Sequence, residues 1–287
     1  MSLWQESQVR FTARRIVILE KCRRSYGFIP FSSLDPRCHL KVQTRFWRTL
    51  IAKKTSVNTV HEEVFATKKK CFGFVRPAND YYVHEAVATL KAGNVIAVPT
   101  DTIYGFSCDV CSCEAIQKIY EIKGRVHTKP LAICVGDVAD IKRYVVVDYL
   151  PSGLLDSLFP GPVTLILKRG EDSESENFLN PGADSLGVRI PDSDFIRRVA
   201  RSLGAAIALT SANLSGNPSS ICIKEFEDLW DQCQSVYDGG FLLSGRAGST
   251  VVDLTSPGTY KILRAGSAKE ETVRILQNHL LLENDGR

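Results

Sequence analysis

Several features that define whole classes of protein are missing from this chain of 287 residues. No uninterrupted apolar run approaches the roughly 20 residues that a membrane-spanning helix needs, and no secretory leader with its apolar core is present. The chain also lacks a Walker-type phosphate loop, a dinucleotide-binding glycine motif and a metalloprotease helix. Its hydrophobic fraction of 44% and charged fraction of 24% are typical of a soluble globular protein.

The cysteine pattern contains neither a disulfide framework nor a metal framework. Nine cysteines are an odd number without a secretory signal, which indicates a reducing compartment. Cys108, Cys111 and Cys113 lie close together, but no second pair stands at metal-ligand spacing, so we expect no metal site. We expect these three to be buried or half-buried side chains around the start of a helix.

Positive charge is concentrated at the N-terminus. Residues 1–54 carry twelve Lys or Arg against three acidic residues, a net charge of +9, whereas the remainder has 24 basic and 29 acidic residues, a net charge of −5. The Arg-rich segment 1–54 is typical of a mitochondrial transit peptide, and the alternative is a disordered basic tail that touches RNA weakly or nothing. Both interpretations place it outside the fold, and we expect a cytoplasmic and mitochondrial location.

Apolar runs and helical periodicities alternate along the rest of the chain. We interpret residues 55–79 as a linker and residues 80–283 as one domain. Strands are predicted at 95–98, 130–135, 163–167, 186–190, 205–209, 251–254 and 260–263, and helices at 80–90, 115–122, 137–144, 195–203, 226–232 and 272–282. Ser112 is the predicted N-cap of the second helix. The alternation predicts an α/β fold with a buried, mostly parallel or mixed sheet.

Polar loops follow two of the predicted strands. Residues 100–102 (TDT) follow the strand at 95–98, and residues 210–216 (TSANLSG) follow the strand at 205–209. Open α/β sheets bind ligands at the carboxyl ends of their strands. A predicted helix separates the first loop from three cations, Lys123, Arg125 and Lys129. An anion is therefore the expected ligand.

A second group of polar residues stands at other strand ends. Arg189 lies among apolar neighbours and therefore needs an anionic partner, either a structural carboxylate or the carboxylate of a substrate. Ser249, Thr250 and Arg264 add further donors, while His127 is predicted to be a loop residue rather than a general base. A site rich in donors for oxyanions and poor in nucleophile–base pairs favours phosphoryl or nucleotidyl transfer.

Six motifs in a fixed order carry a resemblance to a known family. They are residues 99–105 (PTDTIYG), 123–125 (KGR), 159–164 (FPGPVT), 187–191 (GVRIP), 210–215 (TSANLS) and 248–253 (GSTVVD). Over about residues 80–266 the chain resembles the YrdC-like threonylcarbamoyl-AMP synthases, in their short, single-domain form. The resemblance implies a twisted mixed sheet flanked by helices around a concave, positively charged cavity.

The resemblance also implies an activity. Members of this family are nucleotidyltransferases that convert L-threonine, bicarbonate (or CO2) and ATP to threonylcarbamoyl-AMP and pyrophosphate. The product supplies a tRNA modification, threonylcarbamoyl-adenosine, that a separate transferase completes. Mg²⁺ is expected to accompany the pyrophosphate.

Residue roles follow from the same resemblance. The catalytic group it implies is Lys123, Arg125, Ser211 and Asn213. The implied threonine-binding residues are Thr102, Arg189 and Ser249, and the implied ATP-binding residues are Arg125, Lys129, Ser185, Asn213 and Arg264. Arg189 is suited to hold the threonine carboxylate through a bidentate pair.

The chain departs from the family pattern at three positions. Ala265 replaces the usual proline of an Arg-Pro-Gly motif, and Ile221 stands where some relatives have a polar ATP contact. Cys134 stands where microbial members often have a threonine-contacting histidine. The competing hypothesis is a non-catalytic RNA- or tRNA-binding module, which the net charge of −5 outside the N-terminus disfavours.

Overall fold

The computed structural model describes residues 74–124, 130–170 and 179–284. All of them belong to one compact unit that extends from Lys70 to Arg287. The basic segment 1–54 and most of the predicted linker 55–79 lie outside the described residues.

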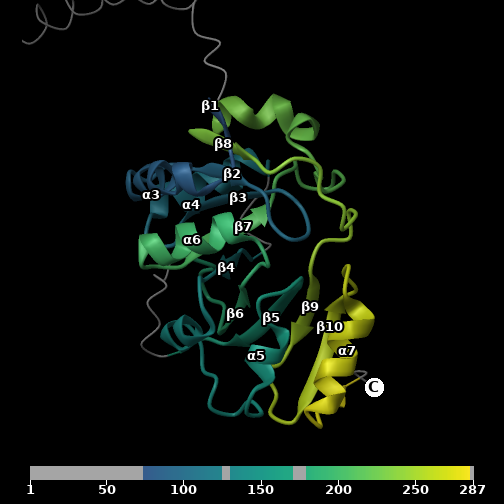
Figure 1. The fold of residues 1–287 in the computed structure, drawn as a ribbon. Coiled ribbons are helices and arrows are strands. Elements are labelled where there is room, and N and C mark those ends of the chain that lie inside the picture. Colours follow the sequence, from purple (N-terminus) through teal and green to yellow (C-terminus); the bar gives the residue numbers. More distant parts are fainter. Residues whose placement is uncertain (1–73, 125–129, 171–178, 285–287) are drawn as a thin grey trace, which may run out of the picture. The chain divides into compact units, whose positions relative to one another are not determined.

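Strands and helices are interspersed along the described chain (Figure 1). In order they are β1 (Phe74–Pro77), η1 (Asp80–Tyr82), α3 (Val83–Lys91), β2 (Ile96–Val98), β3 (Gly105–Asp109), α4 (Cys113–Ile122), β4 (Ala132–Cys134), η2 (Val138–Arg143), α5 (Leu154–Leu158), β5 (Val163–Lys168), β6 (Ser185–Arg189), α6 (Asp194–Leu203), β7 (Ile207–Ser211), η3 (Ile223–Gln232), β8 (Ser235–Asp238), β9 (Thr250–Asp253), β10 (Thr259–Arg264), α7 (Lys269–Asn278) and β11 (Leu282–Glu283). The elements labelled η are 3-10 helices.

The strands of the described residues form one mixed sheet with the order β1-β8-β2-β3-β7-β4-β6-β5-β9-β10-β11. The sheet contains both parallel pairs, such as β4 with β6 and β5 with β9, and antiparallel pairs, such as β3 with β7 and β5 with β6. The sheet is twisted and flanked by helices, which confirms the predicted α/β class.

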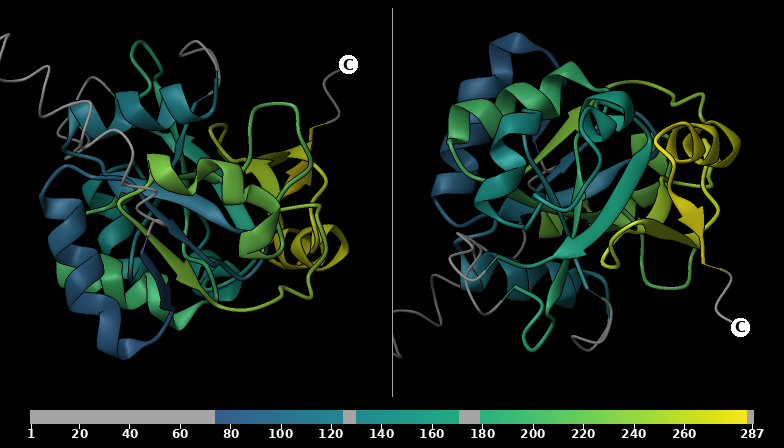
Figure 2. Two further views of the ribbon diagram at one scale, coloured as in Figure 1. Left: turned by 90° about the horizontal axis from the view of Figure 1, so that it is seen from above. Right: turned by 90° about the horizontal axis from the view of Figure 1, so that it is seen from below.

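The two faces of the sheet bury different side chains because successive residues of a strand point to opposite sides. In β2, Ile96 and Val98 pack with α3 and α6, whereas Ala97 packs with the cluster that contains α4. Helices α3 and α6 contact each other and lie side by side in both views of Figure 2. One face is therefore covered by α3 and α6, and the opposite face by α4 and η3.

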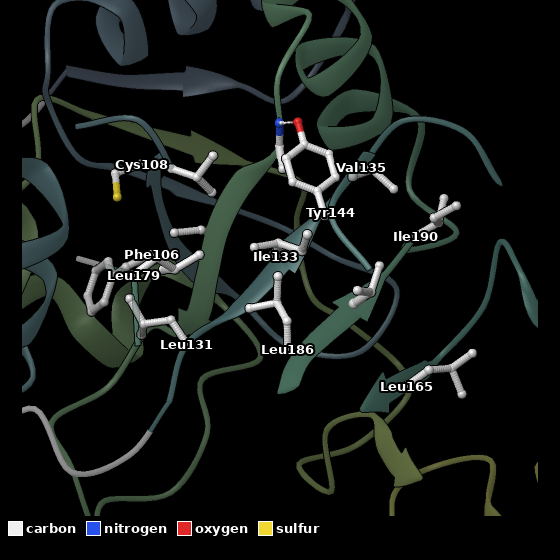
Figure 3. Close-up of a cluster of buried hydrophobic side chains, with 14 of the residues drawn as sticks. Phe106, Cys108, Leu131, Ile133, Val135, Tyr144, Leu165, Leu179, Leu186 and Ile190 are labelled. Atoms are coloured by element: carbon white, nitrogen blue, oxygen red, sulfur yellow. Dashed lines mark hydrogen bonds between the residues drawn. The ribbon is translucent and has the colours of Figure 1, made fainter. Parts of the chain in front are cut away.

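The larger of the two clusters continues into the half of the sheet formed by β4, β5 and β6. Figure 3 shows Ile133, Leu165 and Leu186 from these strands, which belong to the same cluster of buried side chains as Phe106 and Leu131. The hydroxyl of Tyr144 accepts a hydrogen bond from the backbone N–H of Ala206 at 2.8 Å, so this buried ring has its polar atom satisfied.

The structure contains strands that the apolar pattern did not predict. β1 comes from the end of the predicted linker and pairs in parallel with β8, while β3 follows the first polar loop and pairs with β2 and β7. The C-terminal helix was predicted at 272–282, but α7 spans Lys269–Asn278 and is followed by β11. The predicted N-cap is confirmed, since Ser112 Oγ accepts from Ala115 N at 3.2 Å.

No helix among the described residues combines the length and apolar character needed to cross a membrane.

Candidate functional site

A cavity of about 470 Å³ opens where several strands of the sheet end. Ser211, Arg189 and Arg264 are the last residues of β7, β6 and β10, and Ser249 stands directly before β9. All four line the cavity together with Lys123, which caps the C-terminus of α4. Three cations thus face one space, and the described residues that line it include no aspartate or glutamate.

The first polar loop is fixed by its own hydrogen bonds. Thr100 Oγ1 accepts from the backbone N–H groups of Thr102 and Ile103, both at 3.2 Å, and donates to Ile103 O at 2.7 Å. Thr102 is fully buried, and its carbonyl accepts from Ser244 Oγ at 2.5 Å. Short hydroxyl side chains replace regular backbone pairing here, which holds the loop in one conformation.

Arg189 forms a buried ion pair with Asp101 of this loop. Arg189 Nη2 donates to Asp101 Oδ1 at 2.6 Å and to Thr102 Oγ1 at 3.2 Å, and the side chains of Arg189 and Asp101 are 7% and 8% exposed. Asp101 Oδ2 accepts from Asp192 N at 3.0 Å. Of the two anionic partners considered for Arg189, the structural carboxylate is present. Arg189 Nε is buried and has no partner among the described residues.

Lys123 joins the end of α4 to the loop after β7. Its ammonium donates to Ser211 O at 2.6 Å, Ser211 Oγ at 3.1 Å and Asn213 Oδ1 at 2.8 Å. Ser211 Oγ also donates to Asn213 Oδ1 at 2.5 Å, and Asn213 Nδ2 donates to Asn217 O at 2.5 Å. Only 2% of Lys123 is exposed, so these acceptors replace the water that a buried ammonium would otherwise need.

The opposite wall is built around Ser249. Its Oγ lies 2.8 Å from Thr164 Oγ1 and accepts from Arg264 Nη2 at 3.2 Å, and its carbonyl accepts from the same nitrogen at 2.9 Å. Partial burial and, second, the charge of Arg189 lower the pKa of Arg264 below its ordinary value. Two cations that repel each other beside a cavity favour the binding of an anion there.

The structure brings most of the predicted site residues together. Lys123, Arg189, Ser211, Asn213, Ser249 and Arg264 line the cavity, and Thr102 bonds to Arg189 directly behind the wall. Ser185 lies at the start of β6, the end opposite to Arg189, and is absent from the described lining. Arg125, Lys129 and His127 lie outside the described residues.

Two residues of the site were not singled out from the sequence. Asp101 was noted in a polar loop and in the motif at 99–105 but received no role, although the requirement of Arg189 for an anion pointed to a carboxylate. Thr164 was noted as a strand residue and as the end of the motif at 159–164 but received no role, and its contact with Ser249 shows that it belongs to the site.

Cys134 does not replace the microbial histidine as a cavity contact. It is fully buried, and its thiol lies 3.8 Å from Val135 O, outside the described cavity lining. Burial raises the pKa of the Cys134 thiol to about 12. The side chain therefore stays uncharged at neutral pH.

The cysteines around the start of α4 differ from the prediction in one respect. Cys108 is buried, as predicted, but Cys111 and Cys113 are exposed, so the prediction of burial is wrong for these two. Ser112 between them points its hydroxyl at Ala115 N to cap the helix, and this leaves its neighbours toward solvent. Among the described residues, no group of three or more His, Cys, Asp or Glu is arranged to hold a metal.

Comparison with protein families and sequences gives a consistent result. The Sua5/YciO/YrdC family model, described as "Telomere recombination", matches residues 88–266. A threonylcarbamoyl-AMP synthase of Bos taurus is 48% identical over 206 residues, which cover 70% of this chain and 74% of the relative. A threonylcarbamoyl-AMP synthase of Homo sapiens is 49% identical over 197 residues, which cover 67% and 70%.

Solved structures with this fold include one with a bound amino acid. The crystal structure of P. abyssi Sua5 complexed with L-threonine matches with a TM-score of 0.64 and 25% identity, covering 74% of this chain and 61% of that chain. The crystal structure of E. coli YciO matches with a TM-score of 0.60 and 27% identity, covering 67% and 94%.

Proposed function

The chain belongs to the Sua5/YciO/YrdC family, and from this we propose that it is a threonylcarbamoyl-AMP synthase. It would convert L-threonine, bicarbonate or CO2, and ATP to threonylcarbamoyl-AMP and pyrophosphate. The observation that carries the proposal is one cavity lined by Lys123, Arg189 and Arg264 together with hydroxyl and amide groups. The described residues of this lining include no carboxylate. Such a wall suits a triphosphate and an amino-acid carboxylate, both of which are anions.

The cavity divides into two ends under this proposal. Threonine would bind at the end formed by Thr102 and Arg189, which are bonded to each other and, through Arg189, to Asp101, and by Ser249, which is bonded to Thr164. The nucleotide would bind at the end formed by Lys123, Ser211 and Asn213, with Arg264 as a further cation of the lining. Arg125, Lys129 and Ser185 remain proposed nucleotide contacts that the cavity geometry neither includes nor tests.

The proposed reaction needs charge stabilisation rather than a covalent enzyme intermediate. The amino nitrogen of threonine first attacks CO2 and loses a proton, or attacks bicarbonate with loss of water, to form a carbamate. A carbamate oxygen then attacks the α-phosphorus of ATP. The new oxygen–phosphorus bond forms as the bond from the α-phosphorus to the bridging oxygen breaks, and pyrophosphate leaves with that electron pair. Lys123 would hold Ser211 and Asn213 in place beside the phosphates, and Arg264 would offset charge that grows on the phosphate oxygens.

Mg²⁺ and bicarbonate remain parts of the proposal. The described cavity lining offers no carboxylate ligand, so the residues present do not form a magnesium site of their own. Mg²⁺ would enter as part of the nucleotide substrate, held by phosphate oxygens, and no step is assigned to it.

Pyrophosphate release by the full chain tests this function. Purified protein with ATP, Mg²⁺ and bicarbonate should release pyrophosphate when L-threonine is present, and alanine or valine should not replace threonine. Release of phosphate and ADP instead would contradict the proposal, since the reaction breaks the bond at the α-phosphorus. Retained tRNA binding without any pyrophosphate release would favour the RNA-binding alternative.

The cellular setting is proposed from the sequence. The product would be passed to a separate transferase that modifies tRNA. The Arg-rich segment 1–54 would direct some of the protein molecules to mitochondria, while the other molecules stay in the cytoplasm. Weak RNA contact through the same segment is a further part of this proposal.

A further inference from the structure

Three polar side chains from adjacent strands meet at one corner of the cavity. Thr164 lies near the start of β5, Ser249 directly precedes β9, and Arg264 ends β10. Thr164 is 6% exposed and Ser249 is 3% exposed, yet both line the cavity. Their hydroxyl oxygens are 2.8 Å apart, which is a short hydrogen bond between two nearly buried groups.

The two hydroxyl groups of Thr164 and Ser249 have one hydrogen more than the described residues can accept. Each hydroxyl carries one hydrogen, and their mutual bond uses only one of the two. Arg264 Nη2 donates to Ser249 Oγ and therefore supplies a further hydrogen rather than an acceptor. Within the described residues, Ser249 Oγ is the partner of Thr164 Oγ1. Whichever hydroxyl donates to the other, one O–H on the cavity wall is left to donate to a ligand.

The backbone around the pair has little freedom to move. Thr250 N donates to Pro162 O at 3.0 Å, and β5 and β9 are paired in parallel with Val163 opposite Thr250. A Cβ on Gly266 would lie 2.1 Å from Thr250 N and 2.2 Å from the Ser249 carbonyl carbon, so this glycine packs directly on the segment. The leftover O–H is thus presented at a fixed position, which is the requirement for recognising a ligand atom.

An apolar surface lies next to the hydroxyl pair. A Cβ on Gly187 would lie 3.4 Å from Thr164 Cγ2 and 3.2 Å from Ile166 Cδ1, and all three residues line the cavity. The wall therefore presents a hydrogen-bond donor beside methyl groups over a glycine. A ligand with an oxygen and a methyl group close together fits both surfaces.

We propose that Thr164 is a substrate-positioning residue that acts with Ser249 as one hydroxyl pair, donating a hydrogen bond to an oxygen of the bound amino acid. The inference rests on the proposed function, because it assigns the amino-acid end of that site. Thr164 would thereby contribute to the selection of L-threonine, whose side chain carries a hydroxyl and a methyl group on one carbon.

The test compares two substitutions of Thr164 in the full chain. Thr164→Val keeps the shape and removes the hydroxyl, and Thr164→Ser keeps the hydroxyl and removes the methyl group. With pyrophosphate release as the assay, T164V should raise the KM for threonine by about five- to tenfold, as expected for one hydrogen bond to a ligand, and should leave the KM for ATP within about twofold. T164S should recover most of the affinity for threonine that T164V loses.

A double-mutant cycle separates a pair that acts as one unit from two independent contacts. Ser249→Ala alone should raise the KM for threonine, and adding T164V to it should cost less than about twofold more, because the unit is already broken. Calorimetric titration of threonine without ATP measures the same loss apart from turnover.

Several outcomes would overturn the inference. An unchanged KM for threonine in T164V would do so, as would equal rises in the KM for both substrates or fully additive effects of T164V and S249A. In each case an active wild-type protein would leave the proposed function standing. A wild-type protein that neither binds threonine nor releases pyrophosphate would overturn the proposed function and this inference together.

Discussion

Arg189 shows how a single residue of the site is prepared before any ligand binds. Its Nη2 nitrogen bonds to both Asp101 and Thr102, so these two contacts use both hydrogens of that nitrogen. A substrate carboxylate would meet the remaining donors of the guanidinium, and the bidentate pair expected from the sequence would have to share Nη2 with Asp101. Asp101 therefore orients Arg189 and also limits how much of its charge reaches the substrate.

Replacing Asp101 by asparagine should destabilise the fold strongly. The substitution keeps the shape but leaves the Arg189 charge buried without its partner, which costs about 3 to 5 kcal/mol in comparable buried pairs. The free energy of unfolding at pH 7, measured in urea, would show the loss. Asp137→Asn is the matched control, because its ion pair with Arg201 is exposed and should be worth less than about 1 kcal/mol. Equal losses in the two variants would contradict the role given to Asp101.

At the residue scale, the sequence showed that a side chain required a partner of a certain kind more clearly than it showed which residue that partner is. The position of Arg189 in an apolar strand showed that it required an anion, but Asp101 is distant in sequence and only the fold brings the two together. Thr164 ends the motif at 159–164, but nothing local indicated a role for it, since threonine is common in strands and its hydroxyl has meaning only opposite Ser249. The capping role of Ser112, in contrast, is local and was predictable.

At the scale of elements, the strands that were predicted are those with continuous apolar runs. β5, β6 and β7 are flanked by other strands, so their sequences are apolar over most of their length. β1, β3 and β8 were missed because polar residues, glycine or proline interrupt their apolar sequences. Their extended conformation depends on pairing with neighbours, which no local pattern reveals.

The pairing of β1 with β8 leads to a prediction about truncation. A fragment of residues 80–287 lacks β1 and exposes one edge of β8, whereas a fragment of residues 70–287 retains the pair. We expect the longer fragment to unfold cooperatively and the shorter one to have a lower Tm and to aggregate more readily. Circular dichroism melting and light scattering measure both properties. Equal melting of the two fragments would show that β1 adds no stability.

At the scale of the whole molecule, the order of the strands explains the cavity. The chain visits the sheet out of sequence, so that β7, β6, β9 and β10, with residues from four separate motifs, open onto one space. The cations Lys123, Arg189 and Arg264 are scattered over 142 positions of the sequence and converge only in the folded protein.

The charge of this lining predicts a difference between the two substrates. Affinity for ATP should fall by roughly tenfold between low and high KCl concentrations, because mobile ions screen a multiply charged anion from the cations. Threonine is a zwitterion with no net charge, and its affinity should change far less. Calorimetric titrations at several salt concentrations compare the two, and an ATP affinity independent of salt would contradict a positively charged cavity.

The three hydrogen bonds of Lys123 have one more consequence. The proposed product is a mixed anhydride, a compound class that readily acylates free amines, and it would form within reach of a lysine. The Lys123 ammonium donates to Ser211 O, Ser211 Oγ and Asn213 Oδ1, acceptors that favour its charged form, and a charged ammonium has no lone pair with which to attack. The contacts that shape the nucleotide end would therefore also protect the protein from modification by its own product.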